Sequence, residues 1–165
     1  MSVRPLKLTT LAYVRRGHET LMLERAPREH DVHAGRWNGL GGKFLAGESP
    51  EACLRREVRE EAGIEVLGAT LKGVLTFPTF DGTSDVYSFV YIVDRFSGTP
   101  LREGPEGKLH WVETVRLGEL PLWEGDRVFL PWLDQPGVFS AVLRYEGGRF
   151  QGHEVTHYPS ERSAS

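Results

Sequence analysis

Three glutamates stand close together in the chain, at positions 57, 60 and 61. Each residue of an α-helix advances by about 100°, so a helix would place Glu57, Glu60 and Glu61 on one face. Carboxylates at i and i+4 repel each other by a few tenths of a kcal/mol, and a divalent cation with hard oxygen ligands would relieve that repulsion. The spacing therefore indicates a metal site. A solvated helix with Glu–Arg pairs such as Glu51–Arg55 is the alternative that the same residues allow.

The segment that carries these glutamates has the signals of a helix. Ser49 is a good N-cap, and Pro50 suits the first helical position. No glycine or proline interrupts residues 51–62, and Gly63 supplies a C-terminal stop. Next to the acidic face, apolar residues recur at i, i+4 and i+8 and would pack on a sheet: Leu54, Val58 and Ala62. We therefore expect a helix whose acidic face borders buried packing.

The rest of the chain has the patterns of strands and turns. Strands are indicated, by β-branched and aromatic residues or by alternation, at 7–14, 20–24, 73–77, 85–93, 108–113, 139–145 and 149–156. Glycines and a proline predict a loop over 26–43, and Asp126 would cap a short helix over 126–133. Strands on both sides of a central helix predict a mixed α/β fold, with a sheet flanked by helices.

Length, charge and composition set further bounds. The chain has 165 residues, which suits one domain; we expect it over 1–159, with a frayed tail over 160–165. The net charge is −3, which argues against a nucleic-acid polymer as partner. The only cysteine, Cys53, excludes an intrachain disulfide. No apolar run approaches the roughly 18 residues of a membrane span, and the N-terminus lacks a signal peptide's apolar core. We expect a cytoplasmic monomer or homodimer without a membrane partner.

The glutamates belong to a longer pattern. Five residues separate Gly42 from Glu48, and seven more separate Glu48 from a run that reads Arg56-Glu57-Val58, Glu60-Glu61 and Gly63-Ile64. This pattern resembles the Nudix box of the Nudix hydrolases in full, with all seven identities and both aliphatic positions matched. A chance match of seven identities is on the order of one in ten million. The resemblance implies the Nudix fold, an α/β/α sandwich (α+β) with a mixed central sheet.

The resemblance also implies a chemistry. Nudix hydrolases cleave a nucleoside diphosphate linked to another group, and they use Mg²⁺ or Mn²⁺. The polyanionic diphosphate repels an attacking water, and a metal ion neutralises that charge and activates the water. By resemblance, Glu57 and Glu61 are the main metal ligands, Glu60 is a ligand or the general base, and backbone groups near Gly42 complete the metal site.

Three other residues receive supporting roles by resemblance. Glu48 and Arg56 would orient the helix through a salt bridge. Some family members use a later glutamate outside the box as a catalytic group, and Glu106 is the candidate here. An exposed loop carboxylate explains Glu106 equally well.

The segment at 35–43 and the surroundings of Trp123 resemble MutT-like oxidised-purine nucleoside triphosphatases. This resemblance implies that Asn38, Trp123 and Asp126 hold a purine, with Lys43 also binding substrate. An amide can donate to and accept from a base edge, and an indole offers a face for stacking. The implied reaction converts a nucleoside triphosphate such as 8-oxo-dGTP to the monophosphate and pyrophosphate, which would cleanse the nucleotide pool. The ordinary alternatives are that Asn38 is a turn residue, that Trp123 is a core residue and that Asp126 is a helix cap.

Two positions depart from these relatives. Gly125 stands where they have the first of two aspartates, and Val32 stands where a large aromatic residue often lines the base site. A Nudix hydrolase of another nucleoside diphosphate derivative is therefore the alternative, with a nucleotide sugar, ADP-ribose or a dinucleoside polyphosphate as substrate. A non-catalytic nucleotide-binding domain is a more remote one, because such domains usually lose box carboxylates.

A second motif at 153–157 points elsewhere. His153-Glu154-Val155-Thr156-His157 matches the zinc-protease pattern H-E-x-x-H, which requires a helix so that both histidines reach one metal. Val155 and Thr156 favour a strand instead. Residues four apart in a strand are about 13 Å apart, so we expect no zinc site at 153–157.

Overall fold

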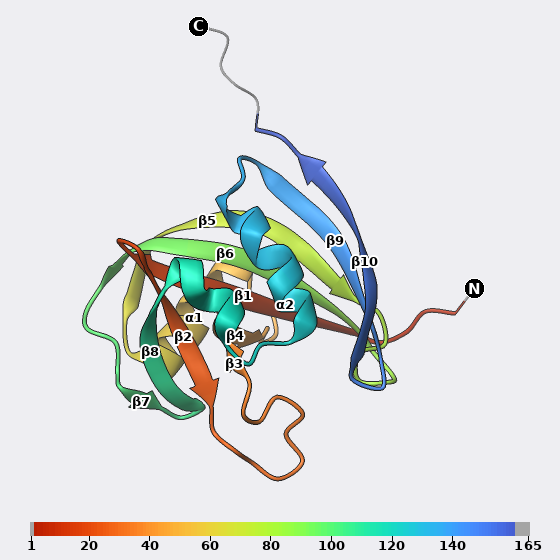
Figure 1. Ribbon diagram of the computed structural model, residues 1–165, viewed down its shortest axis with the longest axis horizontal. Coiled ribbons are helices and arrows are strands. Elements are labelled where there is room, and N and C mark those ends of the chain that lie inside the picture. The colour runs from red at the N-terminus through yellow and green to blue at the C-terminus, as the bar shows by residue number, and fades with distance from the viewer. Residues whose placement is uncertain (1, 161–165) are drawn as a thin grey trace, which may run out of the picture.

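Within residues 2–160, which the computed structural model describes, ten strands pair into one mixed sheet (Figure 1). The strand order is β10-β9-β5-β6-β1-β2-β8-β7, with β3 paired to β2 and β4 paired to β1. β1 runs parallel to β6 and β5 runs parallel to β9, and the other pairs are antiparallel. The bounds are β1 Leu6–Arg16, β2 Glu19–Arg25, β3 Trp37–Asn38, β4 Leu40–Lys43, β5 Glu65–Phe77, β6 Asp85–Ser97, β7 Glu103–Gly104, β8 Gly107–Glu113, β9 Val138–Glu146 and β10 Arg149–Tyr158.

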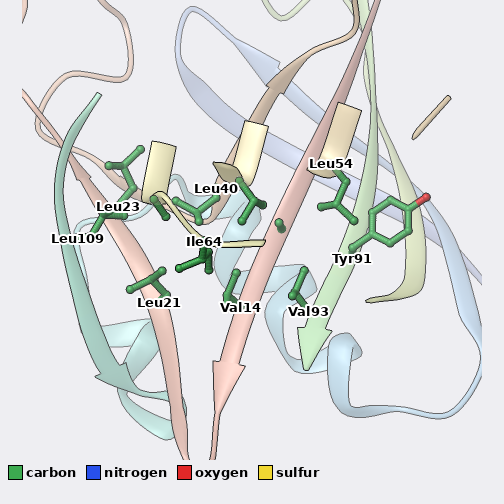
Figure 2. Close-up of a cluster of buried hydrophobic side chains, with 12 residues drawn as sticks. Val14, Leu21, Leu23, Leu40, Leu54, Ile64, Tyr91, Val93 and Leu109 are labelled. Carbon is green, nitrogen blue, oxygen red and sulfur yellow. The ribbon is translucent and has the colours of Figure 1, made fainter. Parts of the chain in front are cut away.

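Helices cover the two faces of this sheet. One face packs against α1 (Pro50–Ala62), and the other packs against η1 (Thr114–Glu119), α2 (Glu124–Phe129) and η2 (Leu130–Asp134). Alternate residues of β1 therefore enter different cores: Val14 joins Leu54 of α1 in one cluster (Figure 2), and Tyr13 joins Phe129 of α2 in the other. The predicted α/β class, with helices flanking a mixed sheet, is confirmed.

The helix predicted from its end signals is α1. The Ser49 side chain accepts a hydrogen bond from the backbone N–H of Ala52 at 3.0 Å. Gly63 adopts the left-handed conformation with φ +70°, and its N–H donates to the carbonyl of Arg59. The apolar stripe predicted beside the acidic face is buried in the core shown in Figure 2.

The loop predicted over 26–43 was wrong in its second half, where β3 and β4 lie. Gly39, between these strands, and Gly41, in β4, are glycines because neighbouring backbone comes very close. A Cβ at Gly41 would stand 2.0 Å from the carbonyl oxygen of Thr10 on β1, and the φ of Gly41 is +144°. Only a glycine at position 41 permits the pairing of β4 with β1. Glycine usually predicts a loop, but at this position it lies within the sheet.

Two further boundaries differ from prediction. β5 begins at Glu65 rather than at residue 73, because its first half pairs with β6 across several register shifts. The helix predicted over 126–133 is α2 followed by η2, and its N-cap is Trp123 rather than Asp126. Pro131 explains the change to a 3-10 helix, since its missing N–H cannot continue an α-helix.

Other expectations concern the last strands, the tail and the membrane. The predicted closing hairpin is confirmed as β9 and β10. Beyond residue 160, the expected frayed tail lies outside the described residues. Among residues 2–160, every helix is too short or too polar to cross a membrane.

Candidate active site

The acidic face of α1 lies against the glycines of β4. The buried Glu61 accepts a hydrogen bond from the N–H of Gly41 at 3.1 Å through Oε2. Glu57 packs directly on Gly42, because a Cβ at that position would lie 2.6–2.7 Å from its carboxyl atoms. Glu60 is more exposed than either. The structure thus places the three predicted glutamates and Gly42 in one place.

Arg56 connects these carboxylates. Its Nε and Nη2 form a two-point ion pair with Glu48, at 2.7 and 2.9 Å. Its Nη1 also donates to Glu57 at 2.8 Å and to Glu60 at 3.2 Å. The predicted Glu48–Arg56 bridge is thus present, and the two further ion pairs of Arg56 are an addition that the sequence did not suggest. Arg56 holds the loop before α1 to the acidic face and compensates its charge.

The carboxylates differ strongly in electrostatic environment. Burial raises the pKa of Glu61 to about 8, and the negative charges of Glu57 and Glu106 contribute to the rise. Burial also raises the pKa of Glu57, against the opposing effect of Arg56. The hydrogen bonds from Arg56 hold the pKa of Glu48 below its usual value. A positive charge placed near Glu61 would therefore favour its ionised form near neutral pH.

Glu106 stands between β7 and β8, on the side of Glu61. Its carboxylate lies 3.4 Å from Arg25 on β2 and 3.6 Å from Arg28. It is close enough to influence the ionisation of Glu61. The structure therefore brings this later glutamate towards the acidic face, although arginines now pair with it. Among residues 2–160, no three acidic, histidine or cysteine side chains already enclose a common metal position.

A second cluster lies around Trp123, which is 8% exposed. The guanidinium of Arg36 covers one face of the indole at 4.3 Å. Three further rings contact it edge-on, with centroid distances of 5.2–5.7 Å: His33, Phe80 and Tyr145. The buried position agrees with the core-residue alternative for Trp123, and the ring neighbours form an aromatic cluster from four separate segments of the chain.

Asn38 and Asp126 lie close in the chain to Arg36 and Trp123 of this cluster. Asn38 lies on β3, two residues after Arg36, and is partly exposed. Asp126 is partly buried on α2. Burial raises the pKa of Asp126 to about 7, although Arg127 and Arg36 oppose the rise. Asp126 is thus a carboxyl that can hold a proton near neutral pH and then donate a hydrogen bond.

Lys43 lies apart from the aromatic cluster. It is exposed at the end of β4, and its backbone carbonyl accepts a hydrogen bond from Arg56 at 2.9 Å. It is therefore near the acidic face of α1 rather than near Trp123.

The two departures from MutT-like relatives have structural counterparts. The N–H of Gly125 donates to the hydroxyl of Tyr145 at 2.6 Å, and a Cβ at Gly125 would stand 2.6 Å from that oxygen. Tyr145 thus occupies the space that a side chain at 125 would need. Val32 is 60% exposed, and the neighbouring His33 stacks on Phe80 instead. Sequence reasoning missed His33, Phe80 and Tyr145, because no local pattern links residues so far apart.

The H-E-x-x-H motif has no zinc-protease geometry. Residues 153–157 lie within strand β10, as the strand-forming residues predict. His153 and His157 both contact the ring of Trp132 rather than a shared metal position.

Known proteins share this fold and sequence. The NUDIX domain model matches residues 5–133. The chain is 35% identical over 118 residues to an uncharacterized Nudix hydrolase, YvcI of Bacillus subtilis, which covers 70% of this chain and 72% of the relative. It is 29% identical over 149 residues to the oxidized purine nucleoside triphosphate hydrolase of Danio rerio, covering 90% of each chain. The structure of the mutator MutT protein from Bacillus halodurans has a TM-score of 0.80 and 28% identity, over 90% of this chain and 97% of that one.

These matches agree with the Nudix box on α1 and with the sheet that carries it. Nudix hydrolases generally use divalent metal ions such as Mg²⁺ and act on small nucleotide substrates. Because the family model covers most of its length, this chain belongs to the Nudix hydrolases.

Proposed function

We propose that this Nudix hydrolase converts a purine nucleoside triphosphate to the monophosphate and pyrophosphate in the cytoplasm, with Mg²⁺ as cofactor and an oxidised purine such as 8-oxo-dGTP as substrate. The observation that carries the proposal is the contact of the α1 carboxylates with the backbone of Gly41 and Gly42. The relative from Danio rerio, which aligns over 90% of this chain, is named for hydrolysis of oxidised purine nucleoside triphosphates.

The residues at α1 and β4 fit a divalent cation. Their donors are carboxylate and backbone oxygens, the hard ligands that Mg²⁺ prefers. A Cβ at Gly42 would fill the space beside the Glu57 carboxylate, and Glu61 has a raised pKa that a cation would lower. Glu57 and Glu61 would hold the ion, together with a backbone group near Gly42. A bound Mg²⁺ would neutralise phosphate charge and activate water.

Glu60 is the general base of the proposed mechanism, with metal binding as its alternative role. It is exposed enough to meet a water molecule, since 56% of its side-chain surface is accessible. Its present partner is Arg56 at 3.2 Å. With an ion bound, Arg56 would keep its two-point pair with Glu48, which leaves Glu57 for the ion and Glu60 for water. Glu48 and Arg56 therefore position the helix, and Glu106 supplies further negative charge close to Glu61.

The purine would lie at the aromatic cluster. The Asn38 amide offers a donor and an acceptor to the base edge, and a protonated Asp126 offers one further donor. Trp123, with Arg36 over one face of its ring, would be the aromatic partner of the base. Lys43, beside α1, would contact the triphosphate rather than the base. The base and the phosphates are thus assigned to separate groups of residues.

A substrate panel tests the proposal. The purified full chain is assayed with Mg²⁺ on 8-oxo-dGTP, dGTP, ADP-ribose and diadenosine tetraphosphate, with kcat/KM and the phosphate products measured for each. We expect 8-oxo-dGTP among the best substrates and pyrophosphate as a product. Preference for ADP-ribose or diadenosine tetraphosphate would establish the alternative substrate class. Binding without hydrolysis of any of the four would favour a non-catalytic domain.

A further inference from the structure

His33 makes a specific hydrogen bond to the indole of the aromatic cluster. The Nε1–H of Trp123 donates to Nδ1 of His33 at 2.9 Å. The imidazole also stacks on Phe80, with ring centroids 6.0 Å apart and planes within 7°. Its backbone N–H donates to Asp31 at 2.9 Å, which fixes the loop beneath it. His33 is thus held between an anchored loop and two aromatic rings.

This hydrogen bond requires the neutral form of the imidazole. Indole is a donor only, so Nδ1 must accept and cannot carry a proton. Protonated histidine has donors on both nitrogens and would set two N–H groups against each other across 2.9 Å. The Trp123–His33 bond therefore exists in one protonation state of His33 and is lost in the other.

The surroundings of His33 favour the neutral form near neutral pH. Burial lowers the pKa of His33, and the charges of Arg25 on β2 and Arg36 beside β3 add to this effect, while Asp31 opposes it. The other elements packed on Trp123 bring Tyr145 from β9. They also bring Asp126 from α2, a group that Arg36 influences. Protonation of His33 in acid would break the bond to the indole.

We propose that His33 is a positioning residue of the purine site, which holds the Trp123 indole through its neutral Nδ1 and releases it on protonation, so that the contribution of this bond to purine binding is lost in acid. This inference rests on the proposed function for its purine ligand. It extends that function, because it predicts a pH dependence of KM that originates away from the carboxylates of α1.

The indole signal of Trp123 tests the hydrogen bond without any substrate. The four tryptophans give indole ¹H–¹⁵N cross-peaks in the full labelled chain, and a Trp123→Phe variant identifies the one of interest. Assignment is needed because Trp37 and Trp132 also lie against histidines. We expect the Trp123 peak to shift further between pH 8 and pH 5 in the wild type than in His33→Asn, which keeps the titration of Asp126 but lacks that of His33. Equal shifts in the two proteins would overturn the inference.

Kinetics then test the effect on purine binding. Asn places an acceptor oxygen at the same reach as Nδ1 but does not titrate, whereas Leu removes the acceptor. As the pH falls from 8 to 5, the KM of the wild type relative to His33→Asn should rise, up to about five-fold once His33 is fully protonated, the equivalent of one net hydrogen bond. This ratio cancels the titration of the substrate phosphates. His33→Leu should show the raised KM at both pH values. The dependence of kcat on pH should be the same in the wild type, His33→Asn and His33→Leu.

A matched control and two outcomes separate this inference from the proposed function. His153→Asn makes the same change beside Trp132 on β10 and should leave the KM profile unaltered. Hydrolysis of purine triphosphates with a KM ratio that does not change with pH would overturn the inference alone. An indole signal that titrates in a chain inactive on purine triphosphates would support the His33–Trp123 bond and overturn the proposed function.

Discussion

The carboxylate of Glu57 rests on the α-carbon of Gly42, so closely that a Cβ at position 42 would stand 2.6–2.7 Å from its carboxyl atoms. This contact joins α1 to β4 at the point where the acidic face meets the sheet. Arg56 pairs with Glu57 from its other side at 2.8 Å. The position of the Glu57 carboxylate is thus set by the absence of a side chain at Gly42 on β4 and by the guanidinium of Arg56 on α1.

Gly42→Ala should therefore displace Glu57 while the fold stays intact. The φ of Gly42 does not lie in the left-handed region, so the substitution introduces crowding rather than backbone strain. A displacement of about 1 Å at a catalytic group can cost about 10²-fold in rate. We expect a loss of that size in kcat/KM, with a higher Mg²⁺ concentration at half-maximal activity. Gly118→Ala is the control, since no atom lies within 4 Å of its Cβ position. Unchanged Mg²⁺ dependence in Gly42→Ala would contradict the metal site.

Glu60→Gln tests the proposed general base. The amide keeps the size of the side chain and can still meet Arg56 through its oxygen, but it cannot take a proton from water. We expect turnover to fall by at least about 10²-fold, within the range for loss of general-base catalysis. Thermal unfolding should change little, because Glu60 is exposed. Near-normal turnover would refute the role. Glu146→Gln, at the exposed end of β9, is the control.

The local parts of this structure could be predicted from sequence, because their causes are local. Ser49, Pro50 and Gly63 mark the ends of α1 through hydrogen bonds within a few residues, and the helical period then places three glutamates together. The Nudix pattern extended this prediction to Gly42 and Glu48. The ion pair of Arg56 with Glu60 has the i, i+4 spacing of neighbours on a helix, whereas its pair with the adjacent Glu57 does not follow from helix spacing.

The parts that sequence missed depend on contacts between distant segments. β4 requires glycine at 41 only because β1 lies against it. The aromatic cluster joins His33 from a loop, Phe80 from a turn and Tyr145 from β9. No periodicity connects these positions. From sequence, Gly125 is a departure from MutT-like relatives that bears on base preference, and the structure shows that it makes room for the Tyr145 hydroxyl.

Asn38→Ala tests the assignment of the base edge. Removing the amide takes away one donor and one acceptor, so the loss should depend on which groups the base presents. We expect kcat/KM to fall by about ten-fold for 8-oxo-dGTP, about one to two hydrogen bonds, and by different factors for dGTP and a pyrimidine triphosphate. The measurement is kcat/KM for the three substrates under one set of conditions. Equal losses for all three would mean that Asn38 has only a structural role.

Asp126→Asn should change how stability depends on pH. Burial raises the pKa of Asp126 in the folded chain to about 7, above the usual value near 4 for an unfolded chain. The folded state therefore binds this proton more tightly, and the associated stability is fully present below about pH 4 and is lost as pH rises towards 7. Asparagine has no proton to lose. Relative to the wild type, Asp126→Asn should gain stability between pH 4.5 and pH 8, by at most a few kcal/mol. Urea unfolding of both proteins at the two pH values measures this difference, and a constant gap between their free energies of unfolding would show that Asp126 ionises normally in the fold.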